Sequence, residues 1–295
     1  MSSRSWILFL VPVFIWSTTY YAITLQLGSV TTPTFAVALR FAFASLLLFA
    51  WLALRREPVR LAANVHPWIF ASGLTSYGIS YVLTYVAEES IPSGLVAVAY
   101  TLMVFLTPAI ALVAYRTPLT RRTWLGGSLG VAGVALCFLP DLLGGVKPAG
   151  AFVWGMAAMF VAAFSSSVGA VCSIKLNRMR IPVVTYTAWS MAYGALATAL
   201  FGAFSGQSLQ LDGRVSFWLA FAYLAVAGTI VAFLCYLTLL KHEGAARAMY
   251  ISVLSPIGAV VVSVLWEGFQ MQALTFIGIL VSVAGAWITL VSKEV

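Results

Sequence analysis

The feature that most constrains this chain is the stretch from Ser93 to Tyr115, which reads SGLVAVAYTLMVFLTPAIALVAY and contains no charged residue. An apolar run of 18 or more residues is long enough to cross a bilayer as a helix. Pro108 lies about two-thirds of the way along and leaves one backbone carbonyl of that helix without its partner. A similar stretch near residue 250 reads GAARAMYISVLSPIGAVVVSVLW, in which Pro256 corresponds to Pro108. Interrupted helices at corresponding positions of two halves indicate the binding site of a secondary transporter.

The composition is that of an integral membrane protein. Of the 295 residues, 62% are hydrophobic and only 8% are charged, whereas soluble domains carry about 25% charged residues. The net charge of +8 does not indicate a nucleic-acid partner, because the basic residues lie in short loops on one side. The three cysteines lie in apolar runs without C-x-x-C spacing, which favours small core residues over a metal or redox site.

Ten uncharged or nearly uncharged segments are candidates for membrane-spanning helices. The connections between them are short and leave no room for a soluble domain. We therefore predict an all-α integral membrane protein with ten transmembrane helices. They fall at about residues 6–27, 34–54, 67–87, 94–115, 123–140, 149–174, 182–204, 215–240, 246–266 and 271–292.

The distribution of charge predicts how these helices are oriented. If both termini are cytoplasmic, 13 of the 16 Lys and Arg residues lie in cytoplasmic loops or tails, and only Lys147 and Arg214 lie in outer loops. Under the same orientation, Glu88, Glu89 and Glu267 fall on the outer side. An excess of positive charge on the cytoplasmic side is the usual signature of membrane topology. We therefore expect both the N-terminus and the C-terminus in the cytoplasm.

The second half of the chain repeats the first at an offset of 148 to 152 residues, as in the pair Pro33 and Pro182. Each half holds five predicted helices. Because five is an odd number, the second half enters the membrane from the opposite side. We therefore expect two inverted five-helix repeats, residues 1–143 and 144–295, related by a pseudo-two-fold axis in the membrane plane.

Inverted repeats with interrupted helices favour alternating access around a site near the membrane midplane, and Pro108 and Pro256 are the predicted hinges. Residues three, four or seven positions apart share a face of a helix, and several helices place aromatic and hydroxyl side chains on such a face. This lining suits a ligand with an apolar body and a few hydrogen-bonding groups. The predicted substrate-binding residues are Trp16, Ser17, Tyr20, Arg40, Tyr77, Tyr81, Tyr100, Met103, Ser165, Ser166 and Tyr250.

These positions also have a purely structural interpretation. Tyr and Trp are enriched at membrane interfaces, and Ser and Thr pack between helices. We expect Tyr85, near the outer end of its helix, at the interface. Small residues on the fifth and tenth helices predict close packing, either inside the chain or across a homodimer, so a monomer and a homodimer both stay open. These residues are Gly126, Gly130, Gly133, Gly278 and Gly285.

Arg40 is the one formally charged residue well inside a predicted span, about 10 Å from its outer end at 1.5 Å per residue. An ionisable residue at this depth is a functional candidate, and a cavity-facing Arg40 would attract a substrate carboxylate. The alternative is an arginine that snorkels outward or bonds carbonyls freed elsewhere in the bundle.

No Asp or Glu lies deep in a predicted span, so the carboxylate of an intramembrane proton relay is missing. We therefore expect a facilitator, or a transporter driven by the gradient of its own substrate. His66 and His242 lie in separate cytoplasmic loops, and the chain contains no H-E-x-x-H, G-x-S-x-G or P-loop pattern. We expect no metal, no cofactor and no enzymatic activity.

Four groups of residues carry a resemblance to a known family. They are Trp16-Ser17-Thr18, Pro33 with Arg40-Phe41, the helices that contain Pro108 and Pro256, and the Gly-x6-Gly spacings Gly126/Gly133 and Gly278/Gly285. Together they resemble the drug/metabolite transporter superfamily, and within it the EamA family of ten-helix proteins with two EamA repeats. The resemblance covers the whole chain. In general aspect the chain is most similar to the YddG-type amino-acid exporters of that family.

This resemblance implies export of aromatic and other apolar amino acids across the cytoplasmic (inner) membrane of a bacterium. The cavity would be lined by helices 1–4 and 6–9, with the fifth and tenth peripheral. The implied partners are a small-molecule substrate and the lipid bilayer. A drug or other-metabolite exporter of the same fold, and a non-transport membrane scaffold or scramblase, remain as alternatives. A sugar-phosphate carrier is disfavoured, because it would need several cationic side chains in the cavity and only Arg40 is available.

Overall fold

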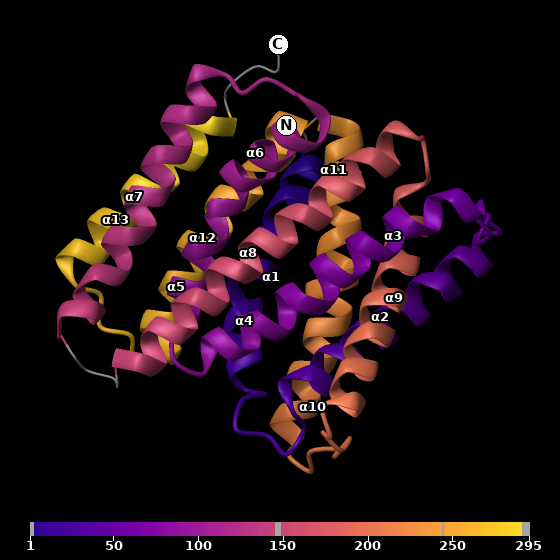
Figure 1. Cartoon of the computed structure of the whole chain (residues 1–295), viewed down its shortest axis with the longest axis horizontal. Coiled ribbons are helices and arrows are strands. Elements are labelled where there is room, and N and C mark those ends of the chain that lie inside the picture. The colour runs from indigo at the N-terminus through magenta and orange to yellow at the C-terminus, as the bar shows by residue number, and fades with distance from the viewer. Residues whose placement is uncertain (1–2, 145–148, 244, 291–295) are drawn as a thin grey trace.

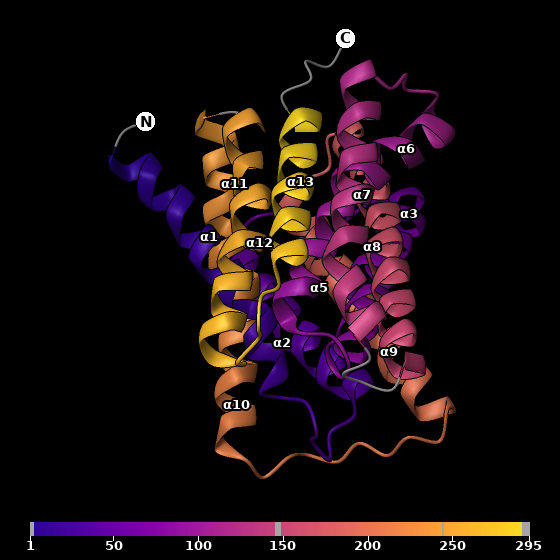
Figure 2. The same cartoon turned by 90° about the vertical axis from the view of Figure 1, so that its left-hand side faces the viewer.

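The computed structural model describes residues 3–144, 149–243 and 245–290, and the regular structure in these ranges is helical throughout, with no β-strand. The helices pack side by side as a bundle, and α1 begins at the end of the bundle where α13 finishes (Figure 1, Figure 2). The prediction of an all-α protein is confirmed.

The first half of the chain forms five continuous or nearly continuous helical runs. The first two are α1 (Ser3–Thr24) and α2 (Pro33–Leu54). The third joins η1 (Ala63–Val65), α3 (His66–Ser72), η2 (Gly73–Ile79) and α4 (Ser80–Glu88). The fourth joins α5 (Ser93–Ala99), η3 (Tyr100–Leu102) and α6 (Met103–Tyr115), and the fifth is α7 (Arg121–Gly144).

The second half follows the same plan. It begins with α8 (Ala149–Arg178) and α9 (Val183–Phe204). The next run joins α10 (Val215–Ala222), η4 (Tyr223–Val231) and α11 (Ala232–Glu243). The last two helices are α12 (Ala245–Trp266) and α13 (Ala273–Leu290).

Seven helical stretches among the described residues are long and apolar enough to cross a membrane, and the stretch Tyr250–Trp266 is a shorter apolar helix. The chain is therefore an integral membrane protein, while the count of ten spans and the cytoplasmic termini stay predictions. The segment expected at 123–140 is longer in the structure, where α7 runs from Arg121 to Gly144. The added first turn holds Arg121 and Arg122, whose long side chains can reach the interface from the end of a spanning helix.

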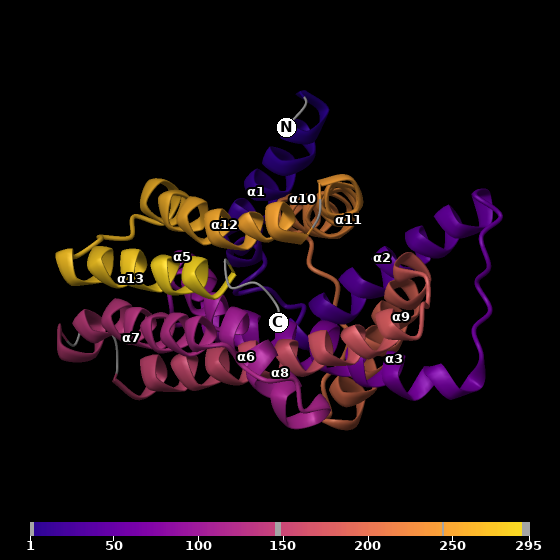
Figure 3. The same ribbon diagram turned by 90° about the horizontal axis from the view of Figure 1, so that it is seen from above.

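The helices α7 and α13 pack against each other at one edge of the bundle (Figure 1, Figure 3). A Cβ atom on Gly133 would overlap the backbone nitrogen of Ser282, and one on Gly278 would lie 2.6 Å from the backbone nitrogen of Cys137. Small residues allow such backbone contact between membrane helices. Four of the glycines predicted for packing thus serve contacts inside the chain, while the choice between a monomer and a homodimer stays open. They are Gly126, Gly133, Gly278 and Gly285.

The third helical run of each half contains a π-helical segment, η2 in one and η4 in the other. A π-helix displaces carbonyl groups from the regular α-helical ladder, and such segments are frequent at functional sites. In η4, the hydroxyl of Thr229 donates a hydrogen bond of 2.8 Å to the carbonyl of Leu224, five residues earlier. The α-helical spacing used for the sequence prediction did not anticipate these segments.

The two proline-containing helices differ from each other. Along the run that contains Pro108, the helix tightens to 3₁₀ geometry at η3, six to eight residues before the proline. The helix α12 passes through Pro256 without such a change. Beside this proline, the hydroxyl oxygen of Ser17 on α1 lies 3.0 Å from the carbonyl oxygen of Ser255. Hydroxyl groups from neighbouring helices commonly stabilise the backbone next to a proline in a membrane.

Turns with positive φ follow helices at corresponding places in the two halves. Each of three pairs, at an offset of 150 or 152 residues, contains one glycine and one arginine: Gly28 and Arg180, Arg56 and Gly206, Arg116 and Gly268. The arginine turns follow α2, α6 and α8, and the glycine turns follow α1, α9 and α12. Under the predicted topology all three arginines face the cytoplasm. Equivalent turns on opposite faces are what inverted repeats require.

Candidate substrate-binding cavity

A cavity of about 600 Å³ lies inside the bundle. Its lining comes from α1, α2, the η2–α4 run, the α5–η3–α6 run, α8, α9, the η4–α11 run and α12. Within the described part of the chain, α7 and α13 contribute no lining residue. The volume is in the range of small-molecule binding sites, about 300–1,000 Å³.

The two ends of the cavity differ. At one end it reaches Asn177, an exposed residue in the last turn of α8, and Val183 at the start of α9. At the other end its lining consists of Ile23, Thr84 and Ala97, which are all buried. The cavity therefore reaches the surface on the face that carries the arginine turns and is closed toward the opposite face.

Arg40 is buried in α2 and lines the cavity, and among the described lining residues no other side chain is charged. Its guanidinium carbon lies 4.9 Å from the ring centre of Tyr81 and 5.2 Å from that of Phe41, which are cation–π distances. Nη2 donates a long hydrogen bond of 3.4 Å to Thr229, whereas Nε and Nη1 are buried without any partner in the described residues. Arg40 thus does not snorkel outward, and two of its nitrogens have unused donor capacity.

The hydroxyl of Tyr100 is held by two hydroxyl groups of α4, at 2.7 Å from Ser80 and 2.8 Å from Thr84. Ser80 itself donates to the carbonyl of Ala162, and Thr84 donates to the carbonyl of Ser80. Since Ser80 and Thr84 donate their own protons to carbonyl oxygens, the single proton of the Tyr100 hydroxyl is donated to one of these two hydroxyls at a time. The ring centre of Tyr100 lies 6.0 Å from that of Tyr20, so the two rings form an aromatic wall.

Other aromatic side chains complete this wall. The indole of Trp16 donates a hydrogen bond of 3.1 Å to the carbonyl of Gly228 in η4. The ring centres of Tyr77 and Phe41 are 5.1 Å apart. Among the described residues, the hydroxyl groups of Tyr20 and Tyr81 have no hydrogen-bond partner. These two hydroxyls can bind a polar group of a ligand, while the rings contact its apolar part.

The structure brings most of the predicted site residues together around the cavity. Eight line it: Trp16, Tyr20, Arg40, Tyr77, Tyr81, Tyr100, Met103 and Ser166. Ser17, Ser165 and Tyr250 lie beside the lining, where Ser17 and Ser165 contact carbonyl oxygens of Ser255 and Thr75 and Tyr250 stacks on Trp287. Pro256 lines the cavity, whereas Pro108 does not. A role of these residues in binding or as hinges stays a prediction.

Several lining residues were missed, and most of them come from the second half of the chain. They include Asn177, Tyr186, Thr187, Thr229, Phe233 and Tyr236. The signal that could have found them is the repeat itself. Two inverted repeats contribute equivalent helices to a central cavity. The repeat therefore predicts that polar and aromatic residues of 182–204 and 215–240 line the cavity, as those of the first half do.

Tyr85 and Glu88, near the end of α4, correct two expectations. Tyr85 is buried and donates a hydrogen bond of 2.6 Å to the side-chain oxygen of Gln26, so its interfacial placement is wrong. Glu88, expected in an outer loop, is 6% exposed, and both of its carboxylate oxygens are buried without a partner among the described residues. Glu88 thus adds a buried carboxylate at the end of α4, whereas the absence of Asp and Glu deep in the spans, and the facilitator inferred from it, stay predictions.

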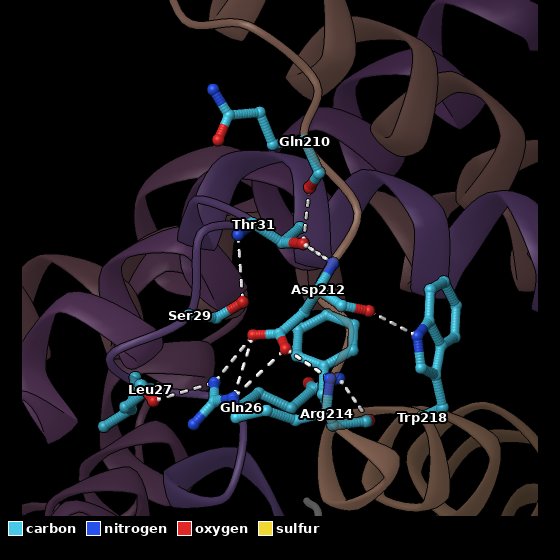
Figure 4. A network of polar contacts seen from close by, with 9 residues as sticks. Gln26, Leu27, Ser29, Thr31, Gln210, Asp212, Arg214 and Trp218 are labelled. Carbon is cyan, nitrogen blue, oxygen red and sulfur yellow. Dashed lines mark hydrogen bonds and ion pairs between the residues drawn. The ribbon is translucent and has the colours of Figure 1, made fainter.

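A polar network lies at the closed end of the bundle, where the segment after α1 meets the segment before α10 (Figure 4). Arg214 forms an ion pair of 2.9 Å with Asp212 and donates to the carbonyl of Leu27. Asp212 donates its backbone N–H to Thr31 and accepts the indole N–H of Trp218 at its carbonyl oxygen. Hydrogen bonds from Arg214 hold the pKa of the Asp212 carboxyl below its usual range. The network thus joins the first and second halves through a pair that stays ionised at neutral pH.

A bundle of apolar helices around a central cavity that reaches only one face has the architecture of a membrane transporter. The chain belongs to the EamA-like transporter family, whose model matches residues 4–139 and 153–291. It is therefore a member of the drug/metabolite transporter group, as its sequence motifs indicate.

Named relatives and a solved structure agree with this assignment. The uncharacterized transporter YdfC of Bacillus subtilis is 25% identical over 83% of this chain and 77% of YdfC. The uncharacterized inner membrane transporter YedA of Escherichia coli is 27% identical over 83% of this chain and 77% of YedA. A crystal structure superposes with a TM-score of 0.67 over 98% of this chain and 96% of that one, at 20% identity, and this likeness shows the fold alone.

Proposed function

We propose that the protein is a secondary transporter that moves small metabolites across the cytoplasmic membrane by alternating access, and that it exports aromatic and other apolar amino acids. The observation that carries this proposal is Arg40, a buried cation with two unused donor nitrogens in an aromatic cavity. The resemblance to the YddG-type exporters supports transport in the outward direction, from the cytoplasm to the outside of the cell.

The cavity offers complementary surfaces for such a substrate. A carboxylate is the group that best matches a guanidinium, because two parallel N–H donors can bind its two oxygens. The rings of Phe41, Tyr81 and Tyr100 provide contact area for an apolar side chain. The free hydroxyl of Tyr20 offers an acceptor for an ammonium group.

The two inverted repeats, proposed as residues 1–143 and 144–295, support alternating access as the mechanism. The cavity reaches the face that the charge distribution assigns to the cytoplasm, which is the state in which an exporter binds its substrate. We propose Pro108 and Pro256 as the hinges of the transition to the opposite state. Pro256 is part of the cavity lining, and Pro108 follows the 3₁₀ segment that carries Tyr100.

A drug exporter of the same fold and a membrane scaffold or scramblase are the competing functions. A cationic drug would be repelled by Arg40, which among the described lining residues is the one charged side chain. A scramblase would need no carboxylate-binding cation. The chemistry of the cavity therefore favours a carboxylate-bearing substrate.

The test is counterflow of radiolabelled phenylalanine in proteoliposomes. We expect counterflow that excess threonine reduces and a cationic dye does not. Because a hydrogen bond to a charged group contributes about 1.5–3 kcal/mol, Arg40→Ala lowers counterflow about 10- to 100-fold, and Arg40→Lys lowers it less. The control is Arg55→Ala, which removes an exposed arginine just after the same helix and leaves counterflow unchanged.

The outcomes separate the three functions. Full counterflow by a well-folded Arg40→Ala protein contradicts the role of Arg40. Accumulation of the dye in place of phenylalanine identifies a drug exporter. Movement of labelled lipid without movement of either solute identifies a scramblase.

A further inference from the structure

Glu88 is the most unusual side chain outside the cavity lining. It is the last residue of α4, 6% exposed, and neither carboxylate oxygen has a hydrogen-bond partner in the described ranges. An ionised carboxylate without donors is very costly to bury, and the neutral acid is the form that such a site tolerates. A structural acid would be expected to have partners, so this burial needs a functional explanation.

The surroundings of Glu88 contain one cation and one further acid. Its carboxyl interacts electrostatically with the guanidinium of Arg40 and with the carboxylate of Glu267, but it forms no ion pair with Arg40. Glu267 is already occupied, because it accepts hydrogen bonds from the backbone and hydroxyl of Ser93 and from Ser263. The titratable and charged side chains around Glu88 are Tyr20 on α1, Arg40 on α2, Tyr85 on α4, Tyr100 on η3 and Glu267 after α12. On α8, the charged residues Lys175 and Arg178 lie in the last turn, far from the α4 C-terminus.

Glu88 also continues the face of α4 that lines the cavity. Tyr81 and Thr84 belong to the lining, and Glu88 follows Thr84 by four residues, which places it one turn further along the same face. Since Thr84 is buried at the closed end of the cavity, Glu88 lies just beyond that end. The cavity thus has a cation with two unused nitrogens in its lining, Arg40, and an acid without hydrogen-bond partners in the described residues just beyond its closed end, Glu88.

We propose that Glu88 binds a proton in the empty transporter and the α-ammonium group of an amino acid in the loaded one, so that substrate and proton are exchanged. A zwitterionic amino acid supplies a partner for each side chain: its carboxylate can bind Arg40, and its ammonium group can bind ionised Glu88. When the ammonium pairs with Glu88, the proton of the carboxyl group leaves to water in the cavity. Binding of substrate and binding of the proton then oppose each other, as an antiporter requires.

This inference rests on the proposed function and adds the energy source to it. A proton gradient directed into the cell drives the empty carrier back with a proton on Glu88, and the loaded carrier moves outward without it. The buried neutral acid is also compatible with the closed outer end seen here. The proposed exchange is an alternative to the facilitator, or substrate-driven carrier, expected from the lack of Asp and Glu deep in the spans.

The first experiment measures proton release when phenylalanine binds to the purified protein in weakly buffered solution with a pH indicator. We expect about one proton released per phenylalanine bound to the parent and to Glu89→Gln, in which the exposed neighbouring acid is changed. Glu88→Gln, which imitates the neutral acid, binds 3-phenylpropionate like the parent but releases no proton with phenylalanine. In the parent, 3-phenylpropionate also releases none, because it lacks the ammonium group. Equal release from Glu88→Gln and the parent overturns the proposal.

A second readout does not depend on the substrate. Infrared spectroscopy of the empty protein across a pH titration detects the band of a protonated carboxyl group. We expect this band in the parent, in Glu89→Gln and in Glu88→Asp, and its loss in Glu88→Gln. An unchanged band in Glu88→Gln overturns the proton site. If no variant binds phenylalanine, the proposed function fails and the exchange with it, while the infrared band still decides whether Glu88 holds the proton.

Discussion

Arginine at the ends of α2, α6 and α8 adopts a backbone conformation that glycine favours. Arg56, Arg116 and Arg180 have φ of 55–56°, whereas the corresponding turns of the other half use glycine. The left-handed conformation costs a residue with a Cβ atom about 1–2 kcal/mol. A positive charge beside a helix C-terminus interacts favourably with the helix dipole, and under the predicted topology these three arginines face the cytoplasm. At these positions the chain therefore accepts a less favourable backbone conformation and gains a positive charge at the end of the helix.

The first prediction concerns Arg56, and the preceding residue, Arg55, offers a matched control. Arg56→Gly relieves the left-handed strain, and after the added flexibility of glycine in the unfolded chain we expect a net gain of about 0.5–1 kcal/mol. Arg55→Gly removes the same charge at a position with φ −83°, where there is no strain to relieve, and it gives no gain. Thermal unfolding in detergent measures both. A lower melting temperature for Arg56→Gly than for Arg55→Gly contradicts the argument.

The pair of helices α7 and α13 shows how glycine spacing determines packing. Gly133 faces the backbone of Gly278 and Ser282, and Gly126 faces Gly285. The helices approach until backbone meets backbone, which is the geometry that small residues allow in membranes. This pair lies outside the cavity lining, so its packing can be changed without touching the candidate site.

The second prediction uses two glycines of the same helix. Gly133→Leu places a side chain where the backbone of α13 lies, and overpacking of this kind costs about 1–3 kcal/mol. Gly130→Leu adds the same side chain at a position with no atom within 4 Å of the added Cβ, and it leaves stability near that of the parent. The measurement is the melting temperature in detergent together with the yield of monodisperse protein. Equal losses for the two variants would show that the α7–α13 contact is not what the glycines maintain.

Much of the fold could be predicted because its determinants are local. The length of each apolar run, the positions of the charged residues and the offset between the halves are all readable along the chain. The same holds for the side chains that line the cavity from α1, α2 and α4, such as Trp16, Tyr81 and Arg40, because residues on one helical face stay together whatever the helix packs against.

The rest depends on contacts between distant segments. Burial of Glu88 follows from the packing of α4 against other helices, and nothing in the residues around it distinguishes it from exposed Glu89. Tyr85 points into the bundle, where its hydroxyl donates a hydrogen bond to Gln26, a partner 59 residues away in the sequence. The π-helical segments η2 and η4 alter which residues share a face, and their sequences carry no signal that α-helical spacing would detect. Local patterns thus locate the cavity but not its closed end.

At the closed end of the bundle, Arg214 pairs with Asp212 and also ties the segment before α10 to the carbonyl of Leu27. We expect Arg214→Gln to weaken this closure and to populate the state that is open on the opposite face. The probe is a cysteine introduced as Ala97→Cys, at a fully buried position of the lining next to the closed end. Its labelling by a maleimide becomes several-fold faster in Arg214→Gln than in the parent. The control Arg60→Gln removes an exposed arginine from another loop and leaves the rate unchanged.

The same probe tests how this closure depends on pH. Because hydrogen bonds from Arg214 lower the pKa of Asp212 in the folded protein, the pair contributes its stabilisation above the ordinary pKa of an Asp, about 3.9. That contribution is lost only as the pH falls through the lowered value. The labelling rate of Ala97→Cys, corrected for the reactivity of the thiolate, therefore stays constant from neutral pH down to about pH 4. A rise in the corrected rate between pH 5 and pH 4 that Arg214→Gln abolishes would mean that Asp212 titrates in its ordinary range, and that its hydrogen bonds with Arg214 do not lower its pKa in the folded protein.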